Sequence, residues 1–492
     1  MIKNHLKYGS LLAASLSPLS IYSNAQDVEA KPNILFFLVD DMGWMDAGFQ
    51  GSTFYETPNI DKLASQGMVF TNAYAAHPRS VPSRYALLTG KYPARAQMPG
   101  GSEDEGIGGH KRSDDLSHLK VGEPTMASAL KSAGYTTFFA GKWHLSSDGA
   151  FPQSMGFDVN IAGGEAGSPI SYFFPYNEGK QTGKKDPING LEQGVAGEYL
   201  TDRITQETVT FLNRHHHANP SKPFFALVSH YAVHEPLQAK EEHIAYFKKK
   251  LATQTFPGPE YVDEGVGKTK MRQDNPVYAA MVYSMDESLG KIVDALQTQG
   301  ELDNTVIIFF SDNGGLSNCG TRERQLATSN FPLRAGKGHL YEGGIREPMI
   351  VCWPGKIKSG SKSNTMVTGT DFFPTLLQMA GVPLMPQSHK DGQSFLWSLE
   401  GKADPNPGRA IFWHSPIARP QATGDAPCSA MRKGNYKLVE FHDSKRVELY
   451  NLEDDLSETN NLAPSQKRIT NRMLKELHAW RKSAGVFMLE YH

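Results

Sequence analysis

Four short segments of the chain are continuously apolar and then turn abruptly polar. They read NILFFLVDDMGW from Asn33, TTFFAGKWH from Thr136, FFALVSHYAVHEP from Phe224 and TVIIFFSDNGG from Thr305. Uninterrupted apolar runs of this kind are typical of strands that a parallel sheet buries on both faces. Segments with helical periodicity, long enough for crossover connections, lie between them: Asn59–Met68, Thr125–Gly134, Glu198–Asn213 and Val277–Thr298. The alternation predicts an α/β fold with a large, mostly parallel sheet flanked by helices.

The pattern changes near residue 384. Short strands follow, RAIFWH from Arg409, CSAMRKGNYKLVEF from Cys428 and KRVELYNL from Lys445, and a final helix is expected around Gln466–Lys482. A chain of 492 residues also exceeds the length at which a single hydrophobic core stops growing. We therefore predict a large domain over residues 31–384, which contains the sheet, and a smaller C-terminal subdomain, with an antiparallel sheet and a helix, over residues 385–492.

The first residues have the pattern of an export signal. Lys3 and Lys7 precede an apolar stretch from Leu11 to Ile21, and small residues lead to a cleavage point near Ala25. No cysteine lies near that point, which argues against a lipid anchor, and no later run approaches the about 18 apolar residues of a membrane span. We expect a signal peptide at residues 1–25 and a periplasmic or secreted protein without a membrane span.

Composition narrows the partners further. The formal net charge is -2, so bulk charge gives no reason to expect nucleic-acid binding. Cys319, Cys352 and Cys428 are an odd number for an exported protein, so at most one disulfide is expected. The tracts His215–His217 and Lys248–Lys250 fit solvated helical surfaces better than binding sites. Composition indicates no oligomeric state.

Polar residues of catalytic or ligating types follow all four apolar segments. They are Asp40 and Asp41, Lys142 and His144, His234, and Asp312 and Asn313. Ligands of open parallel sheets bind beyond the carboxyl ends of the strands. Asp and Asn are also common turn residues, so one pair alone would indicate little, but four segments together predict a site. The four Asp and Asn side chains offer only oxygen ligands, the set that Ca²⁺ or Mg²⁺ prefers over zinc.

Ser80 begins the segment SVPSRYALLTG. Pro82 is suited to the first position of a helix that Gly90 would end. Ser80 would then lie at the helix N-terminus, where backbone amides and the helix dipole favour an anion. The alternative is an ordinary N-cap serine, and a serine nucleophile would also need a neighbouring base. The glycine-rich segment NFPLRAGKGHLYEGGIREP adds cations to those already near this edge: Lys337 and Arg346, besides Arg84 and Lys142.

These motifs resemble the type I, formylglycine-dependent sulfatases, a family of the alkaline-phosphatase-like superfamily that includes secreted bacterial carbohydrate sulfatases. The family signature is Cys or Ser, any residue, Pro, a small residue and Arg, followed by a helix closing on Leu-Thr-Gly, and it is similar to SVPSR and LTG here. A second signature resembles GKWH at residues 141–144. The similarity extends through DDMGWMD, YAVHEPLQA, SDNGG, TDFFPTLL and ELYNLEDDLSETNNLA, so it covers nearly the whole mature chain.

The resemblance implies a sulfuric ester hydrolase that uses a modified residue. Ser80 would be oxidised to formylglycine, whose hydrated form supplies the nucleophilic oxygen. A sulfate ester on plain serine would be stable, whereas the hydrated aldehyde has a second hydroxyl that expels sulfate. A serine in place of the cysteine implies a partner, a formylglycine-generating enzyme that is able to oxidise serine. The protein would stay inactive in a host that lacks this enzyme.

The resemblance also assigns the surrounding residues. Arg84 would hold the modified residue, Lys142 and Lys337 would bind sulfate oxygens, His144 would steady the hydrated aldehyde, and His234 would protonate the leaving sugar oxygen. Calcium, or alternatively magnesium, would be bound by Asp40, Asp41, Asp312 and Asn313. These roles suit the reaction because the transferring sulfuryl group carries negative charge, which cations stabilise, and a sugar alkoxide leaves poorly without a positioned acid.

The expected substrate is a sulfated saccharide, attacked at a chain end or as a free sugar, with a galactose-type residue suggested by likeness to glycan-degrading sulfatases. Two long polar loops, 100–119 and 163–187, follow elements that lead to the catalytic edge. The candidate substrate-binding residues are His110, Lys111, Arg112, Tyr172 (with Phe173 and Phe174) and His230. The loops packing on one another, and His230 packing beneath its strand end, are the alternatives.

Two other functions remain open from the sequence. A phosphodiesterase or phosphonate hydrolase of the same superfamily would share much of the site, and relative rates on a sulfate and a phosphate ester would distinguish it. A noncatalytic glycan-binding protein would keep the scaffold without the modification. The intact set of acidic and basic residues argues against that second alternative.

Overall fold

The four predicted strands lie side by side in the middle of an eight-stranded sheet. They are β1 (Asn33–Val39), β3 (Thr136–Gly141), β5 (Phe224–Ser229) and β8 (Thr305–Ser311), in the sheet order β11-β2-β10-β8-β1-β5-β3-β4. The other strands are β2 (Met68–Tyr74), β4 (Val159–Ile161), β10 (Met349–Cys352) and β11 (Ser361–Thr368). All neighbouring pairs are parallel except those that β10 makes with β2 and β8. The predicted fold class is confirmed.

The computed structural model describes residues 31–98, 119–146, 149–176, 188, 190–486 and 488, together with Met1. Alternate side chains of β1 enter two separate cores, Leu35 and Phe37 on one face and Ile34 and Phe36 on the other. All four are completely buried. Burial on both faces is the reason why the strand sequence is continuously apolar rather than alternating.

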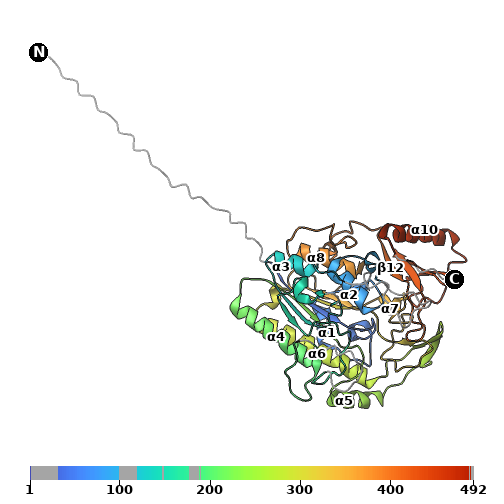
Figure 1. The fold of residues 1–492 in the computed structure, drawn as a ribbon, viewed down its shortest axis with the longest axis horizontal. Coiled ribbons are helices and arrows are strands. Elements are labelled where there is room, and N and C mark those ends of the chain that lie inside the picture. The colour runs from blue at the N-terminus through green and yellow to red at the C-terminus, as the bar shows by residue number, and fades with distance from the viewer. Residues whose placement is uncertain are drawn as a thin grey trace. The chain divides into compact units, whose positions relative to one another are not determined.

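Helices cover both faces of the sheet (Figure 1). The first core contains residues of α1 (Pro58–Gln66), α4 (Leu200–Ala218), α5 (Glu241–Leu251) and α6 (Pro276–Thr298). The second contains residues of α2 (Ser80–Thr89), α3 (Met126–Ser132) and α8 (Phe372–Met379). The four helices predicted between the strands are confirmed as α1, α3, α4 and α6, with ends that differ by a few residues.

The histidine tract at the end of α4 differs in part from the expectation of a solvated surface. His217 is exposed, but His215 is buried, with its ring 5.7 Å from Phe211 and 5.5 Å from Phe224 between centroids. Its position one turn after Phe211 places it on the apolar face of the helix. Lys248 and Lys249 on α5 are exposed, as expected.

The C-terminal part forms a four-stranded antiparallel sheet, as predicted. Its strands are β12 (Ala410–Ser415), β13 (Cys428–Lys433), β14 (Tyr436–Phe441) and β15 (Val447–Asn451), in that order. Helix α10 (Lys467–Ala484) packs on this sheet, and Trp480 stacks on Phe412 with ring centroids 4.8 Å apart. Residues from Pro32 onward cluster as one compact unit, so the division near residue 384 stays a prediction.

The cysteines and the lengths of the helices bear on two expectations from the sequence, and a third feature is a small sheet that the sequence did not predict. Cys319, Cys352 and Cys428 are all buried free thiols, so no disulfide joins them. Across the described residues, no helix is both long enough and apolar enough to span a membrane. A small sheet of β6 (Tyr261–Glu264), β7 (Gly267–Lys270) and β9 (Asn318–Cys319) was not predicted, because its strands lack an apolar run.

Gly141 ends β3 directly before Lys142, and the neighbouring backbone leaves no room for a side chain. A Cβ there would lie 1.9 Å from the Ser229 carbonyl oxygen, and φ is +107°. Gly134, before the same strand, has a similar φ of +95° but open space around it. We predict that Gly134→Ala costs about 1 kcal/mol of unfolding free energy and Gly141→Ala about 3 kcal/mol or more. Urea unfolding of both variants tests this, and equal costs would show that the close contact with Ser229 is unimportant.

Candidate active site

Two adjacent strands deliver the acidic residues to one edge of the sheet. Val39 pairs with Ser311 at the ends of β1 and β8, so Asp40 and Asp41 lie opposite Asp312 and Asn313. Oxygen atoms of Asp40, Asp41 and Asp312 all lie within 4.8 Å of one another. The Asp41 backbone turns sharply there, with φ at 59°. The parallel register therefore accounts for the convergence of residues that are far apart in the sequence.

Each of the three carboxylates is paired with a cation. Lys142 Nζ lies 2.6 Å from Asp40 Oδ2, and Lys337 Nζ lies 2.6 Å from Asp41 Oδ2. Arg84 Nε lies 2.8 Å from Asp312 Oδ2. Lys142 and Arg84 are almost completely buried, whereas the Lys337 side chain is 15% exposed. The structure thus brings together the three acids and three of the predicted cations.

Ser80 lies at the centre of this cluster, at the N-terminus of α2. Its Oγ is 3.0 Å from Asp40 Oδ1 and 3.1 Å from Asn313 Oδ1, and Lys142 Nζ is 3.3 Å from it. The N-cap residue is Arg79, so Ser80 is the first helical residue rather than the cap. Pro82 is consequently the third helical residue and not the first, a position that also needs no backbone donor. Gly90 ends the helix in the left-handed conformation, as predicted.

The side-chain oxygens of this cluster suit a metal ion in addition to the paired cations. Burial and the neighbouring Asp312 raise the pKa of Asp40 to about 7, although Lys142 opposes the shift. Burial also acts to raise the pKa of Asp41, but Lys337, His234 and Lys142 outweigh it and hold that pKa below its usual range. A buried set of three carboxylates and one amide therefore fits a hard divalent ion, which prefers oxygen ligands.

The two predicted histidines lie near the charged cluster, His234 beside Asp41 and His144 within electrostatic range of Lys142 and Arg84. His234 Nδ1 is 2.7 Å from the Glu235 carbonyl oxygen, which leaves Nε2 facing Asp41 Oδ2 at 3.6 Å. Burial and Lys337 lower the pKa of His234 to about 3. His144 has no side-chain partner at Nδ1 among the described residues, and burial with Lys142 holds its pKa well below the usual range. Burial and the neighbouring cations thus disfavour the protonated form of both imidazoles.

The structure also adds residues that the sequence did not single out. Ser229, at the end of β5, accepts a hydrogen bond from Arg84 Nη1 at 2.6 Å and donates one to the Lys142 carbonyl at 2.7 Å. Its position as the polar last residue of an otherwise apolar strand was an available signal. Glu347 is completely buried, and neither carboxylate oxygen has a hydrogen-bond partner in the described structure. Burial and nearby acids, Asp312 first, raise its pKa well above the usual range.

Some predicted residues lie elsewhere. Arg346 donates to the Thr71 carbonyl and pairs with Glu342 at 3.2 Å, so it supports the fold rather than the cation cluster. His230 is completely buried, and its Nε2 is 2.9 Å from Ser288 Oγ. The structure therefore favours the packing alternative for His230 over substrate contact.

The expected aromatic platform is also not formed by Tyr172. This residue is completely buried, and its hydroxyl lies 2.7 Å from the Tyr231 carbonyl oxygen and 2.8 Å from that of His234. It therefore braces the segment that carries His234 instead of presenting a face to a sugar. Phe173 and Phe174 are half-buried and pack against the first core. His110, Lys111 and Arg112 lie outside the described residues.

The fold and the buried acidic cluster at its strand ends define a member of the alkaline-phosphatase-like superfamily. Residues 32–382 match the family described as Sulfatase, and residues 335–483 match the one described as N-sulphoglucosamine sulphohydrolase, C-terminal. The chain belongs to the sulfatase family and is a sulfuric ester hydrolase.

Individual relatives support this assignment over most of the chain. A sulfatase of Formosa agariphila is 30% identical over 96% of this chain and 92% of the relative. The N-acetylgalactosamine-6-sulfatase of Rattus norvegicus is 34% identical over 78% of this chain and 68% of the relative. Among solved structures, Ps i-CgsB in complex with k-i-k-neocarrahexaose is 30% identical, with a TM-score of 0.71 over 92% of this chain and 93% of that one.

Proposed function

We propose that this protein hydrolyses sulfate esters on saccharides, with Ser80 as the site of the nucleophile. The observation that carries the proposal is the placement of Ser80 Oγ within 3.3 Å of Asp40, Asn313 and Lys142. An ordinary capping serine would bond its own helix, but Ser80 points to the ends of β1 and β8 instead. Oxidation of Ser80 gives formylglycine, an aldehyde that adds water. One hydroxyl of this hydrate is the proposed nucleophile, and the other allows the release of sulfate.

The proposed metal is Ca²⁺, with Mg²⁺ as the alternative, held by Asp40, Asp41, Asp312 and Asn313. Such an ion supplies positive charge for the sulfate oxygens. Lys142 and Lys337 bind the same oxygens, because both ammonium groups already lie against the acidic cluster. Arg84 donates hydrogen bonds to Asp312, Ser229 and the Lys142 carbonyl. In the proposal, this network fixes the position of the modified residue. His144 steadies the hydrated residue.

His234 is the proposed proton donor to the leaving sugar oxygen. The Glu235 carbonyl fixes the proton on Nδ1, so Nε2 is the atom that faces the reacting groups. The imidazole is neutral without substrate because burial and Lys337 lower its pKa. A bound sulfate ester brings negative charge next to Lys337 and so favours protonation at Nε2.

The proposed substrates are sulfated glycans that lose a sulfate group from a terminal sugar residue, with a galactose-type sugar favoured by the relatives. The rat relative and a Bacteroides thetaiotaomicron relative are named for N-acetylgalactosamine 6-sulfate, and the structural relative Ps i-CgsB is bound to k-i-k-neocarrahexaose. The proposed signal peptide at residues 1–25 would bring the protein to such glycans in the periplasm or outside the cell. The serine-oxidising maturation enzyme is the further proposed partner.

We predict that the matured enzyme turns over at least one galactose-type saccharide sulfated at a single position faster than a simple aryl sulfate. The measurement is a screen of mono- and disaccharides with sulfate at each hydroxyl, beside the aryl sulfate and the matching phosphate esters. Activity on the aryl sulfate alone would contradict the carbohydrate assignment. Faster turnover of the phosphate esters would favour a phosphodiesterase.

A further inference from the structure

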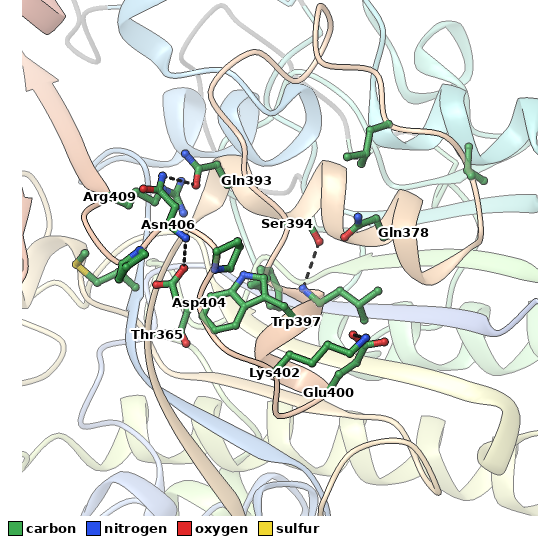
Figure 2. A pocket seen from close by; sticks show the side chains of 17 residues that line it. Thr365, Gln378, Gln393, Ser394, Trp397, Glu400, Lys402, Asp404, Asn406 and Arg409 are labelled. Carbon is green, nitrogen blue, oxygen red and sulfur yellow. Dashed lines mark hydrogen bonds and ion pairs between the residues drawn. The ribbon is translucent and has the colours of Figure 1, made fainter.

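A cavity lies in the segment that leads from the large sheet to the small antiparallel sheet (Figure 2). Its volume is about 730 Å³, within the range of small-molecule sites. Residues of β11, α8, α9 (Leu396–Leu399) and the loop 400–409 line it. None of the proposed catalytic residues or metal ligands lines this cavity.

One part of the cavity wall is apolar. It comprises Val382, Leu384, Leu396 and Trp397, of which Leu384 is 44% exposed and Trp397 is half-buried. Figure 2 shows the Trp397 indole among the polar side chains of the cavity. An indole face bordered by aliphatic side chains suits a flat ligand with an apolar face.

The remaining wall is polar and already ordered. Asn406 donates through Nδ2 to Gln393 Oε1 at 3.1 Å, and through its backbone amide to Asp404 Oδ1 at 2.7 Å. Within the described residues, the Trp397 Nε1, the Gln378 amide and the second Asp404 oxygen have no hydrogen-bond partner. The cavity therefore offers both donors and acceptors that a hydroxyl-rich ligand can use.

The charges in the cavity disfavour an anion. Lys402 Nζ is 2.7 Å from Glu400 Oε2, and both Arg409 Nη atoms bond the buried Asp371 carboxylate, at 2.6 and 2.7 Å. Lys402 is neutralised by Glu400, whereas Arg409 interacts with both Asp371 and Asp404, so the negative charges at this wall outnumber the positive ones. This excess of negative charge would repel a sulfated unit but not a neutral one.

We propose that this cavity binds a neutral hexose unit of the glycan, with its ring stacked on Trp397 and its hydroxyls bonded by Asp404 and the amides of Gln378 and Gln393. A hexose ring presents a C–H face and polar edges, which match the two parts of the wall. The identity of the glycan rests on the proposed function. A second contact of this kind holds a polymer near the active site by raising its effective concentration.

The test measures binding rather than turnover, so it is independent of whether the sulfatase assignment for this glycan is correct. Calorimetric titration of Ser80→Ala protein would use k-i-k-neocarrahexaose and its chemically desulfated form as probes. We expect saturable binding of the desulfated probe that Trp397→Ala weakens by about tenfold or more. Tyr246→Ala, which removes an exposed aromatic residue of α5, is the matched control and should leave binding unchanged.

A second variant keeps the proposal testable if Trp397→Ala fails to fold. Asp404→Asn removes the excess negative charge and should reduce the preference for the desulfated probe over the sulfated one. The proposal is overturned if neither probe binds, if binding is insensitive to both Trp397→Ala and Asp404→Asn, or if the cavity prefers the sulfated probe. It is also overturned if sedimentation shows a dimer that Trp397→Ala dissociates, because the cavity would then be a self-association surface.

Discussion

Ser80→Ala is expected to lower sulfate-ester turnover by at least about 10⁴-fold without unfolding the protein. The Ser80 side chain is buried among Asp40, Asn313 and Lys142, so the substitution removes the oxygen that the proposal assigns as the source of the nucleophile. Arg79 is the N-cap residue of α2 and no side chain caps this helix, so the substitution removes no capping hydrogen bond. Steady-state turnover and the thermal midpoint of the variant are the measurements.

Ser284→Ala is the matched control, because Ser284 is a completely buried serine on α6 that bonds His243 instead of the site. Its turnover should stay close to that of the parent protein. Ser80→Cys adds a positive arm, since it should restore activity in a host whose maturation enzyme oxidises only cysteine. Substantial activity of Ser80→Ala would contradict the assignment of the nucleophile.

Asp312→Asn is expected to reduce bound divalent metal and to lower turnover by at least about 100-fold. The substitution is nearly isosteric, and its amide oxygen can still accept from Arg84 Nε, so the fold and the position of Arg84 should persist. It removes one of the three carboxylates that lie within 4.8 Å of one another. Elemental analysis of the purified protein and activity with added Ca²⁺ are the measurements.

Asp286→Asn provides the comparison for losing a buried carboxylate elsewhere. Asp286 lies on α6 and accepts hydrogen bonds from Asn59 and Ile60, and it is not one of the proposed metal ligands. This variant should keep its metal and its turnover. If Asp312→Asn also kept full metal content, the proposed ligand set would be wrong.

The sheet and its catalytic edge were predictable because the pattern there is local. Each central strand is continuously apolar and each ends in a polar group, so the parallel arrangement brings the groups at Asp40, Lys142, His234 and Asp312 to one edge. The sequence did not indicate that β10 runs antiparallel between β2 and β8. A short apolar segment contains no signal for the direction in which its strand runs.

The roles of individual aromatic and imidazole side chains were less predictable. Tyr172 and His230 have residue types common in sugar sites, yet both are completely buried and bonded to neighbouring elements. Tyr172 is bonded to the Tyr231 carbonyl and His230 to Ser288, and the two members of each pair are distant in the sequence. The local sequence pattern indicates where the strands end, but it contains no information on such long-range contacts.

The mass of the peptide that spans Ser80, taken from active protein matured in a serine-competent host, tests the central claim most directly. The account predicts a peptide lighter than the serine form by two hydrogen atoms, because oxidation converts the hydroxymethyl group to an aldehyde. It also predicts that activity rises in proportion to the modified fraction. Fully active protein in which every such peptide retains an intact serine would contradict the account.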